Sequence, residues 1–341
     1  MRAAVFFENG GPEVLRIEDV ETPEPGPGEV RVAVRAASLN HLDLWVRRGL
    51  PFEIPMPHIG GSDLAGVVDA VGPGAEHVPI GTRVVVDPSL DYDWYDDDSQ
   101  GDSIERRELR LIGEHTQGGF AEFCTVPADN LLEIPEHVSF EMAGSAGLTF
   151  VTAWHGLMVQ GGLRAGERVL ITGASGGVST AAVQIARLAG AKVFAVTSGA
   201  ENVGRVEKLG ADVVYDRLEV DYGRQLHADT GKKGVHLVLD SVGEATWTTN
   251  VRALGVRGRL VAYGATTGPK GEADIRMMFW KKLTLMGSTM GSPKDFRTVM
   301  GLMFDGKLAP VVHEVMPLDE VRRAHELLEE GKVFGKLVLT P

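Results

Sequence analysis

The chain has 341 residues, of which 43% are hydrophobic and 24% charged, which is enough for two packed domains and excludes a disordered or collagen-like chain. Its formal net charge of -13 at pH 7 opposes binding to nucleic acid or to an anionic membrane surface. The N-terminus has no apolar signal-peptide core, and no apolar run approaches the ~18 residues of a membrane span. We therefore expect a soluble, cytoplasmic protein that binds neither nucleic acid nor membrane.

Cys124 is the only cysteine, so an internal disulfide is excluded. A thiolate zinc site needs several convergent Cys or His ligands, which one cysteine cannot supply. No activating base lies near Cys124 in the sequence, and we expect it to be a small core residue rather than a nucleophile.

The first part of the chain, to about residue 135, consists of short apolar runs cut by Gly and Pro. Runs such as EVRVAVRAA, DLAGVVDAVG and TRVVVDP predict strands of an antiparallel, barrel-like domain. Ser139 is placed to cap a helix running through FEMAGSAGLTFVTAWHGL.

Strands and helices alternate in the next part of the chain. The apolar runs RVLIT, KVFAVTS, VVYD, HLVLDSV, RLVAYG and TLMGST are separated by helical segments, which is typical of a parallel sheet with helices on both faces. A helix that begins near Pro317 and stops at Gly331 then precedes a last strand, KLVLTP. We predict one domain from residues 1–145 and 291–341, interrupted by a second at 146–290.

A glycine-rich turn, ITGASGGVS at 171–179, follows a short apolar strand and opens a helix. In this context backbone N–H groups and the helix N-terminus hold a pyrophosphate. Ser179 replaces the third glycine of the usual fingerprint and is small enough for the helix to approach the strand. The turn predicts a dinucleotide site.

The end of the second strand of this domain favours NADPH over NADH. An NAD site places Asp or Glu there to bind the ribose hydroxyls, whereas this strand ends in Thr197 and Ser198. Their hydroxyls, with Arg205 further along the helix, can bind a 2′-phosphate instead. Arg205 can equally be a solvated helix charge.

Several motifs together resemble the medium-chain dehydrogenase/reductase superfamily over essentially the whole chain. They are GSDLAGVVDAVG, GEHTQGGFAEFCTVPADNLLEIP, TGASGGVST, DSVG, GRLVAYG and GKLVL, in the family's order and spacing. The resemblance implies an α/β protein in which a GroES-like β-barrel catalytic domain brackets a Rossmann domain with a doubly wound parallel sheet. It also places the active site in the cleft between them.

The zinc-dependent branch of this superfamily holds its catalytic zinc with Cys, His and Cys. By motif, the corresponding positions here are Asn40, Ser62 and Ser145, which are poor zinc ligands because neutral oxygen donors do not replace thiolate and imidazole. The stretch 87–111, which matches the four-cysteine lobe of that branch, has no cysteine. The resemblance therefore points to the zinc-free, quinone oxidoreductase-like branch, with no zinc expected.

The same stretch is rich in aspartate. Its residues can form a solvated acidic loop or bind a hard cation through oxygen ligands, but they lack the EF-hand spacing. We favour the solvated loop, and we expect three histidines near the predicted active site to be ordinary hydrogen-bonded residues rather than metal ligands. The aspartates are Asp91, Asp93, Asp96, Asp97, Asp98 and Asp102, and the histidines are His41, His58 and His115.

The zinc-free branch passes a hydride from NADPH to a quinone or an α,β-unsaturated carbonyl. The charge that develops on the carbonyl oxygen needs a hydrogen-bond donor, and the Asn40 amide is our first candidate, although it can also be a structural amide capping a turn. Asp43 orients neighbours or is simply a buried carboxylate. Trp45 stands where the branch often has Tyr. Its ring either lines the binding site of a planar acceptor or belongs to the core.

The resemblance also carries over a set of cofactor contacts at the ends of the parallel strands. The last strand of the domain commonly pairs with its copy in a second subunit, which implies a homodimer. Two rival functions remain open: a zinc-dependent alcohol dehydrogenase with atypical ligands, and a non-catalytic NADPH-binding protein. The expected cofactor residues are Thr149, Gly173, Ala174, Ser175, Gly176, Gly177, Val178, Thr197, Ser198, Arg205, Tyr215, Val242, Gly243, Tyr263, Gly264, Gly287 and Ser288.

Overall fold

The computed structural model describes residues 1–90 and 109–341. These residues form two compact units, Met1–Thr149 with Ser292–Pro341, and Phe150–Gly291. The predicted junctions, at 145/146 and 290/291, lie close to these bounds.

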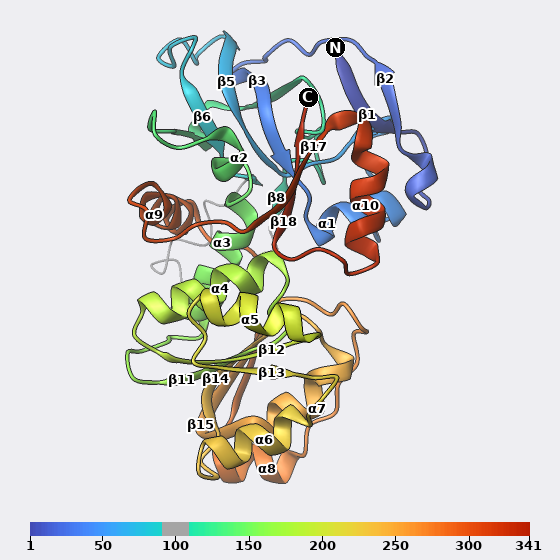
Figure 1. Ribbon diagram of the computed structural model, residues 1–341. Coiled ribbons are helices and arrows are strands. Elements are labelled where there is room, and N and C mark those ends of the chain that lie inside the picture. The colour runs from blue at the N-terminus through green and yellow to red at the C-terminus, as the bar shows by residue number, and fades with distance from the viewer. Residues whose placement is uncertain (91–108) are drawn as a thin grey trace. The chain divides into compact units, whose positions relative to one another are not determined.

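The first unit is built on a seven-stranded sheet in the order β10-β6-β5-β3-β18-β17, with β9 also paired to β3 (Figure 1). Its pairs are antiparallel except β17 with β18, which are parallel. The C-terminal strand therefore completes a sheet that the N-terminal part begins. The strands are β3 (Glu29–Ser38), β5 (Asp63–Val71), β6 (Arg83–Val86), β9 (Phe123–Pro127), β10 (Leu131–Glu133), β17 (Val312–Pro317) and β18 (Lys336–Thr340).

Two small sheets and short helices surround this sheet. Alternate residues of β3, such as Val30, Val32 and Val34, are buried in one apolar core with residues of α1 and α10. Cys124 is also buried in this core, which raises the pKa of its thiol to about 12. The elements are β1 (Arg2–Phe6), β2 (Arg16–Asp19), β4 (His58–Ile59), β7 (Ser89–Leu90), β8 (Arg110–Leu111), α1 (His41–Arg48), α9 (Pro293–Phe304), α10 (Val321–Glu329), and the 3-10 turns η1 (Pro12–Val14), η2 (Ala128–Asn130) and η4 (Leu318–Glu320).

The helix predicted to follow Ser139 is broken in the structure. Ser139 caps α2 (Phe140–Ala143), accepting a hydrogen bond from Met142 N at 3.2 Å as expected. The chain then turns at Gly144, where a Cβ would lie 2.8 Å from Ala36 O, before α3 (Gly147–Trp154) and the π-helical turn η3 (His155–Gln160). The periodicity missed the break because a close approach to β3, rather than the local pattern, ends the first helix.

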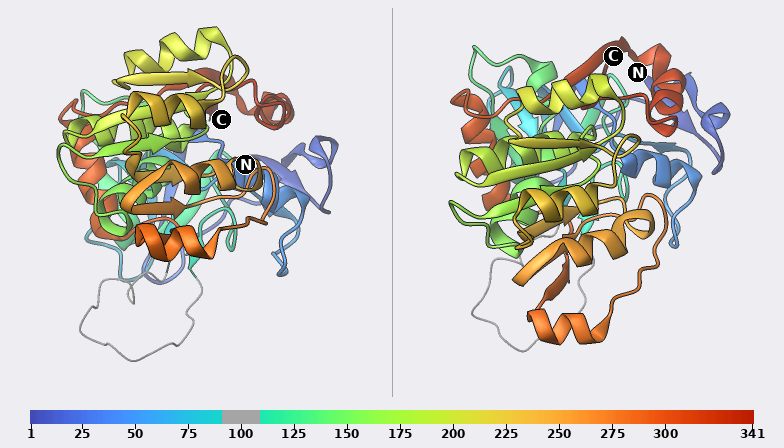
Figure 2. Two further views of the ribbon diagram at one scale, coloured as in Figure 1. Left: turned by 90° about the horizontal axis from the view of Figure 1, so that it is seen from below. Right: turned by 60° about the horizontal axis from the view of Figure 1, so that its bottom comes forward.

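The second unit is a six-stranded parallel sheet in the order β13-β12-β11-β14-β15-β16. Figures 1 and 2 show α4 and α5 on one face and α6, α7 and α8 on the other, which is the expected Rossmann arrangement. The elements are β11 (Arg168–Ile171), α4 (Gly177–Leu188), β12 (Lys192–Thr197), α5 (Ala200–Lys208), β13 (Val213–Asp216), α6 (Tyr222–Asp229), β14 (Val235–Asp240), α7 (Glu244–Ala253), β15 (Leu254–Ala262), α8 (Ile275–Lys281) and β16 (Thr284–Gly287).

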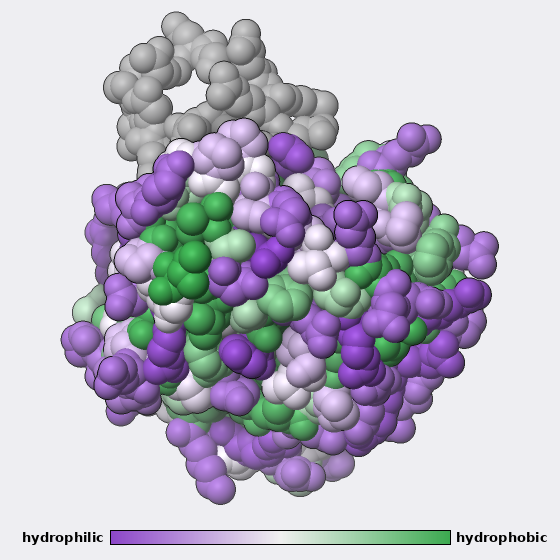
Figure 3. All heavy atoms as spheres, turned by 90° about the horizontal axis from the view of Figure 1, so that it is seen from above, coloured by the Kyte–Doolittle hydropathy of each residue, from purple (hydrophilic) through white to green (hydrophobic). Residues whose placement is uncertain are grey.

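The visible surface is mostly polar. On the face drawn in Figure 3, hydrophilic residues predominate and apolar residues form smaller patches. Among the residues that the structure describes, no helix has the length and apolar character needed to cross a membrane.

Candidate active site

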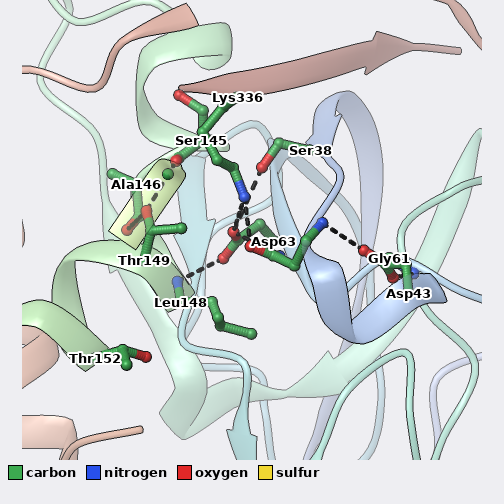
Figure 4. Close-up of polar contacts among 12 residues, drawn as sticks. Ser38, Asp43, Gly61, Asp63, Ser145, Ala146, Leu148, Thr149, Thr152 and Lys336 are labelled. Atoms are coloured by element: carbon green, nitrogen blue, oxygen red, sulfur yellow. Dashed lines mark hydrogen bonds and ion pairs between the residues drawn. The ribbon is translucent and has the colours of Figure 1, made fainter. Parts of the chain in front are cut away.

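Three polar side chains meet in the interior of the first unit. Lys336, at the start of β18, donates from Nζ to Asn40 Oδ1 at 2.5 Å. It also donates to Asp63 Oδ2 at 3.2 Å (Figure 4). Asn40 Nδ2 donates to Asp63 Oδ2 at 3.0 Å, which closes a triangle that we call the Asn40–Asp63–Lys336 triad. The three residues are only 5%, 1% and 4% exposed, so these polar groups interact away from water.

Strand pairing brings the triad together. β3 pairs with β5 on one side, with Ser38 opposite Asp63, and with β18 on the other, with Ser38 opposite Val338. Asn40 lies two residues after the end of β3 and is the N-cap of α1. The triad therefore lies where the end of β3 meets the starts of β5 and β18, three segments that are distant in the sequence.

Four donors surround the Asp63 carboxylate. Besides Asn40 and Lys336, the backbone N–H of Leu148 donates to Oδ1 at 2.6 Å and Ser38 Oγ donates to Oδ2 at 3.4 Å. A buried carboxylate with this many donors is compensated in its ionised form. Burial lowers the pKa of the Lys336 ammonium, and the charge of Asp63 and its hydrogen bond oppose that change.

Asp43 connects the start of α1 to the segment before β5. Its Oδ2 accepts from Asn40 N at 2.7 Å and its Oδ1 accepts from Gly61 N at 3.0 Å. Burial raises the pKa of Asp43 to about 6, while these hydrogen bonds and Lys336 oppose the rise. Its contacts are those of a residue that orients Asn40.

Glu114 is a second carboxyl with altered acidity in this unit. Burial, followed by the charge of Asp43, raises its pKa to about 7. The neighbouring His115 accepts a hydrogen bond at Nδ1 from Leu111 N at 3.1 Å, and its ring stacks on Phe52. His58 is likewise an ordinary hydrogen-bonded histidine, with Nε2 3.1 Å from Gly113 O.

Of the three positions that match zinc ligands, two hold side chains engaged in other contacts. Asn40 belongs to the triad, and Ser145 Oγ donates to Met142 O at 3.1 Å. Ser62 Oγ is buried and has no hydrogen-bond partner among the described residues. Within residues 1–90 and 109–341, no group of three or more His, Cys, Asp or Glu side chains is arranged to hold a metal ion.

Trp45 and Thr149 lie in different surroundings from each other. Trp45, on α1, is 40% exposed with the Arg48 guanidinium 5.5 Å from its ring centre, so the alternative of a buried core tryptophan is wrong. The Thr149 hydroxyl donates to Ser145 O at 3.4 Å and Ala146 O at 3.3 Å, in the segment just before α3.

The glycine-rich turn in the second unit connects β11 to α4. Gly173 has a φ of +58°, and Gly176 is the N-cap of α4, so Ala174, Ser175 and Val178 lie in the turn or in the first helical residues with Gly177. A helix of this length presents unpaired N–H groups and a positive dipole end at this point. The expected strand, turn and helix are thus present.

A hydrogen-bond network lies directly beneath this turn. Ser179 Oγ donates to Thr172 O at 2.9 Å and lies 3.0 Å from the Tyr263 hydroxyl. The buried carboxylate of Asp240 accepts from the Thr172 hydroxyl, from Gly243 N and from two side chains of α7. Ser179 therefore adds a hydrogen bond that the usual glycine cannot make.

The residues expected at the adenosine ribose lie at the ends of β12 and β13. Thr197 Oγ1 is buried without a partner among the described residues, and Ser198 follows it. Arg205 is paired with Glu201 on its own helix at 3.8 Å. The Tyr215 hydroxyl donates to Asp229 Oδ2 at 2.8 Å.

The remaining expected cofactor residues follow the next three strands. Tyr263 N donates to Asp240 O and Ser288 N donates to Ala262 O, both at 2.9 Å, which orders the strand ends. Ser288 Oγ is buried and has no partner among the described residues. Val242 and Gly243 follow β14, Gly264 follows Tyr263 after β15, and Gly287 ends β16.

The structure also identifies residues that the sequence did not. Lys336 and Ser38 join Asn40, although neither belongs to a motif that specifies chemistry. Asp216, at the end of β13, accepts from Gly199 N at 3.0 Å and places a carboxylate beside the predicted ribose site. The signal available for Lys336 was its position: it is the first residue of β18, and β18 pairs with β3, the strand that precedes Asn40. The aspartates from Asp91 to Asp102 lie outside the described residues.

The comparisons with known proteins cover the whole chain. Residues 26–136 match the alcohol dehydrogenase GroES-like domain, and residues 177–305 match the zinc-binding dehydrogenase family. The quinone oxidoreductase of Mus musculus is 30% identical over an alignment of 350 positions that covers 99% of this chain and 97% of that protein.

Solved structures extend this similarity. An NAD-dependent alcohol dehydrogenase is 40% identical, with a TM-score of 0.94 over 100% of both chains. A crotonyl-CoA carboxylase/reductase solved in complex with NADP is 28% identical, with a TM-score of 0.89 over 99% of this chain and 94% of that one. The fold and these relatives define an oxidoreductase that uses an NAD(P) cofactor on a small-molecule substrate. The chain belongs to the medium-chain dehydrogenase/reductase superfamily.

Proposed function

We propose that the protein is an NADPH-dependent reductase of quinones or α,β-unsaturated carbonyls that works without catalytic zinc. The observation that carries this proposal is the Lys336 ammonium hydrogen-bonded to Asn40 and Asp63. A lysine cation beside Asn40 and Asp63 opposes a divalent ion there, and the neutral oxygens of Ser62 and Ser145 are weak zinc ligands. The donor set does not fit zinc.

The residues of the second unit fit a dinucleotide. The N-terminus of α4 suits a pyrophosphate. The buried hydroxyls of Thr197 and Ser288, which have no partner within residues 1–90 and 109–341, offer hydrogen-bonding groups. Bound there, the cofactor supplies a hydride. Thr197, Ser198 and Arg205 support NADPH in particular, because no carboxylate ends β12.

The first unit supplies groups for an electron-poor acceptor. As negative charge moves onto the carbonyl oxygen of such an acceptor, a fixed amide N–H can hold it, and Asn40 has a second N–H besides the one given to Asp63. Burial raises the pKa of Glu114 to about 7, so this group can exchange a proton near neutral pH and is the candidate proton source. Trp45 offers an apolar, partly exposed ring for a planar acceptor.

A second candidate is an alcohol dehydrogenase. Its support is the 40% identity with an NAD-dependent alcohol dehydrogenase, together with the unpartnered Ser62 hydroxyl. Oxidising a simple alcohol requires stabilisation of an alkoxide, for which zinc is the usual Lewis acid. Stoichiometric bound metal would favour this candidate.

Initial rates of nicotinamide oxidation test the proposal. NADPH and NADH are compared with a panel of quinones and enones, before and after treatment with a chelator. Turnover that prefers NADPH and survives the chelator supports the proposal. Activity that is lost with the chelator and restored by zinc supports the alcohol dehydrogenase, whereas tight NADPH binding without any turnover supports a non-catalytic binding protein.

A homodimer and a cytoplasmic location complete the proposal. β16 is an edge strand of the six-stranded sheet, and its free backbone groups can pair with a second copy. Nearby, Ile275, Phe279 and Trp280 on α8 are 76%, 62% and 81% exposed. The single cysteine suits a reducing compartment.

A further inference from the structure

We propose that Lys336 is a positioning residue that holds the Asn40 amide in the one orientation able to stabilise an oxyanion on the acceptor. This inference rests on the proposed function of the same site. It assigns to the residue that opens β18 a role that depends on a fixed positive charge next to Asn40.

The chemistry of the triad determines which way the amide faces. An ammonium only donates hydrogen bonds, so the atom of Asn40 that faces Lys336 is the carbonyl oxygen. An ionised carboxylate only accepts, so the atom that faces Asp63 is the amide nitrogen. Without Lys336, the carbonyl loses its partner and the side chain can rotate about its last bond.

The contacts also polarise the amide. The Lys336 ammonium lies 2.5 Å from Asn40 Oδ1 and withdraws electron density from the amide, which makes its N–H groups better donors. One N–H is given to Asp63 at 3.0 Å, and the other has no acceptor among the described residues and can meet a substrate oxygen. Asp63 accepts from Ser38 Oγ and Leu148 N as well as from Asn40 and Lys336, and it stays in place as the counter-charge.

Water cannot substitute for Lys336 at this position. Its side chain is 4% exposed and that of Asp63 is 1% exposed, so loss of the ammonium leaves Asp63 as a buried, less compensated anion. A purely structural ion pair would have the same burial. A positioning role and a purely structural role of Lys336 differ in the effect on kcat that they predict.

Three variants test the proposal. Lys336→Met keeps the length of the side chain and removes its charge, and Lys336→Arg keeps the charge. Lys307→Met is the matched control, because Lys307 is 53% exposed and forms a surface ion pair with Asp305. We expect Lys336→Met to lower kcat for the acceptor by about 10- to 100-fold, with the Kd for NADPH unchanged within about twofold. Lys336→Arg should recover part of the loss, and the control should match the wild type.

A double-mutant comparison shows whether Lys336 acts through Asn40. If it does, Lys336→Met combined with Asn40→Ala reduces kcat no further than Asn40→Ala alone, because the amide to be positioned is already gone. A fully multiplicative loss, or an unchanged kcat in Lys336→Met, overturns the proposal. Circular dichroism and thermal unfolding identify any variant that fails to fold, in which case Lys336→Arg and Lys336→Gln replace Lys336→Met.

An equilibrium probe separates this inference from the proposed reaction. p-Nitrophenol, which absorbs differently as phenol and phenolate, is titrated in the presence of the enzyme and NADP. An oriented amide beside a fixed cation should lower the pKa of the bound phenol by about one unit, and Lys336→Met should abolish that shift. If the wild type reduces no quinone or enone but shows this shift, the reaction is wrong and the role of Lys336 stands. Absence of the shift in the wild type overturns the inference.

Discussion

The carboxylate of Asp43 accepts a hydrogen bond from the backbone N–H of Gly61 at 3.0 Å, and in doing so connects α1 to the segment that leads into Asp63. The other oxygen of Asp43 accepts from Asn40 N at 2.7 Å. One buried carboxylate therefore sets the spacing between Asn40 and Asp63, two members of the triad. Neither hydrogen bond involves the atoms proposed to meet the substrate.

Replacing Asp43 by Asn tests this spacing. An Asn side chain can accept one of the two backbone N–H groups but presents a second donor to the other, so we expect a loss of ~1–3 kcal/mol in the free energy of unfolding. Because Asn40 shifts, kcat should fall by about 10-fold or more. Urea unfolding and initial rates measure both. Asp129→Asn, at an exposed position, is the control. If the two variants had the same kcat and the same free energy of unfolding, the positioning role of Asp43 would be contradicted.

Glu114→Gln should change how stability depends on pH. Burial raises the pKa of Glu114 from 4.5 to about 7, so between these values the folded protein holds a proton that the unfolded chain releases. This group therefore destabilises the fold as pH rises through that interval, by up to ~3 kcal/mol above pH 7.

The variant lacks this titration, and it should be more stable than the wild type at pH 8 and nearly equal to it at pH 4.5. Urea unfolding at the two pH values is the measurement. The exposed Glu136→Gln serves as the control and should show no such difference. If Glu114→Gln changed the free energy of unfolding by the same amount at both pH values, ionisation of Glu114 would not be the cause of the change.

Ser198→Asp should reverse the cofactor preference. A carboxylate at the end of β12 repels a 2′-phosphate and can accept from the ribose hydroxyls of NADH. We expect the KM for NADPH to rise by about 10- to 100-fold while that for NADH changes by less than about threefold. Ser198→Ala removes only the hydroxyl and is the control. If NADH is already preferred by the wild type, Asp216 beside Gly199 is the carboxylate to test next.

Trp280→Glu should weaken the proposed homodimer. Trp280 is 81% exposed in the single chain, so the substitution leaves the fold of the monomer intact but places a charge beside the edge strand. Sedimentation velocity should show the dimer dissociating at a protein concentration at least about 10-fold higher than for the wild type. Leu218→Glu, at a residue 64% exposed beyond β13, is the matched control. A monomeric wild type would refute the dimer itself.

The order of elements and the dinucleotide turn could be predicted from the sequence because both depend on neighbouring residues. Period-2 and period-3.6 patterns distinguish the strands from the helices, and Gly173 has a positive φ that a larger side chain would strain. Asn40, Ser62 and Ser145 are poor zinc ligands by residue type alone, but the absence of zinc stays a prediction that rests on the resemblance.

The contacts of the site were decided by tertiary structure. Lys336 and Asn40 are 296 residues apart and meet only because β3 pairs with both β5 and β18. The exposure of Trp45 and the bond from Tyr215 to Asp229 likewise depend on packing between distant segments. Local sequence determines which residues form a strand or a turn, but the partner of a buried charge is selected by sheet register and by the cost of leaving that charge alone.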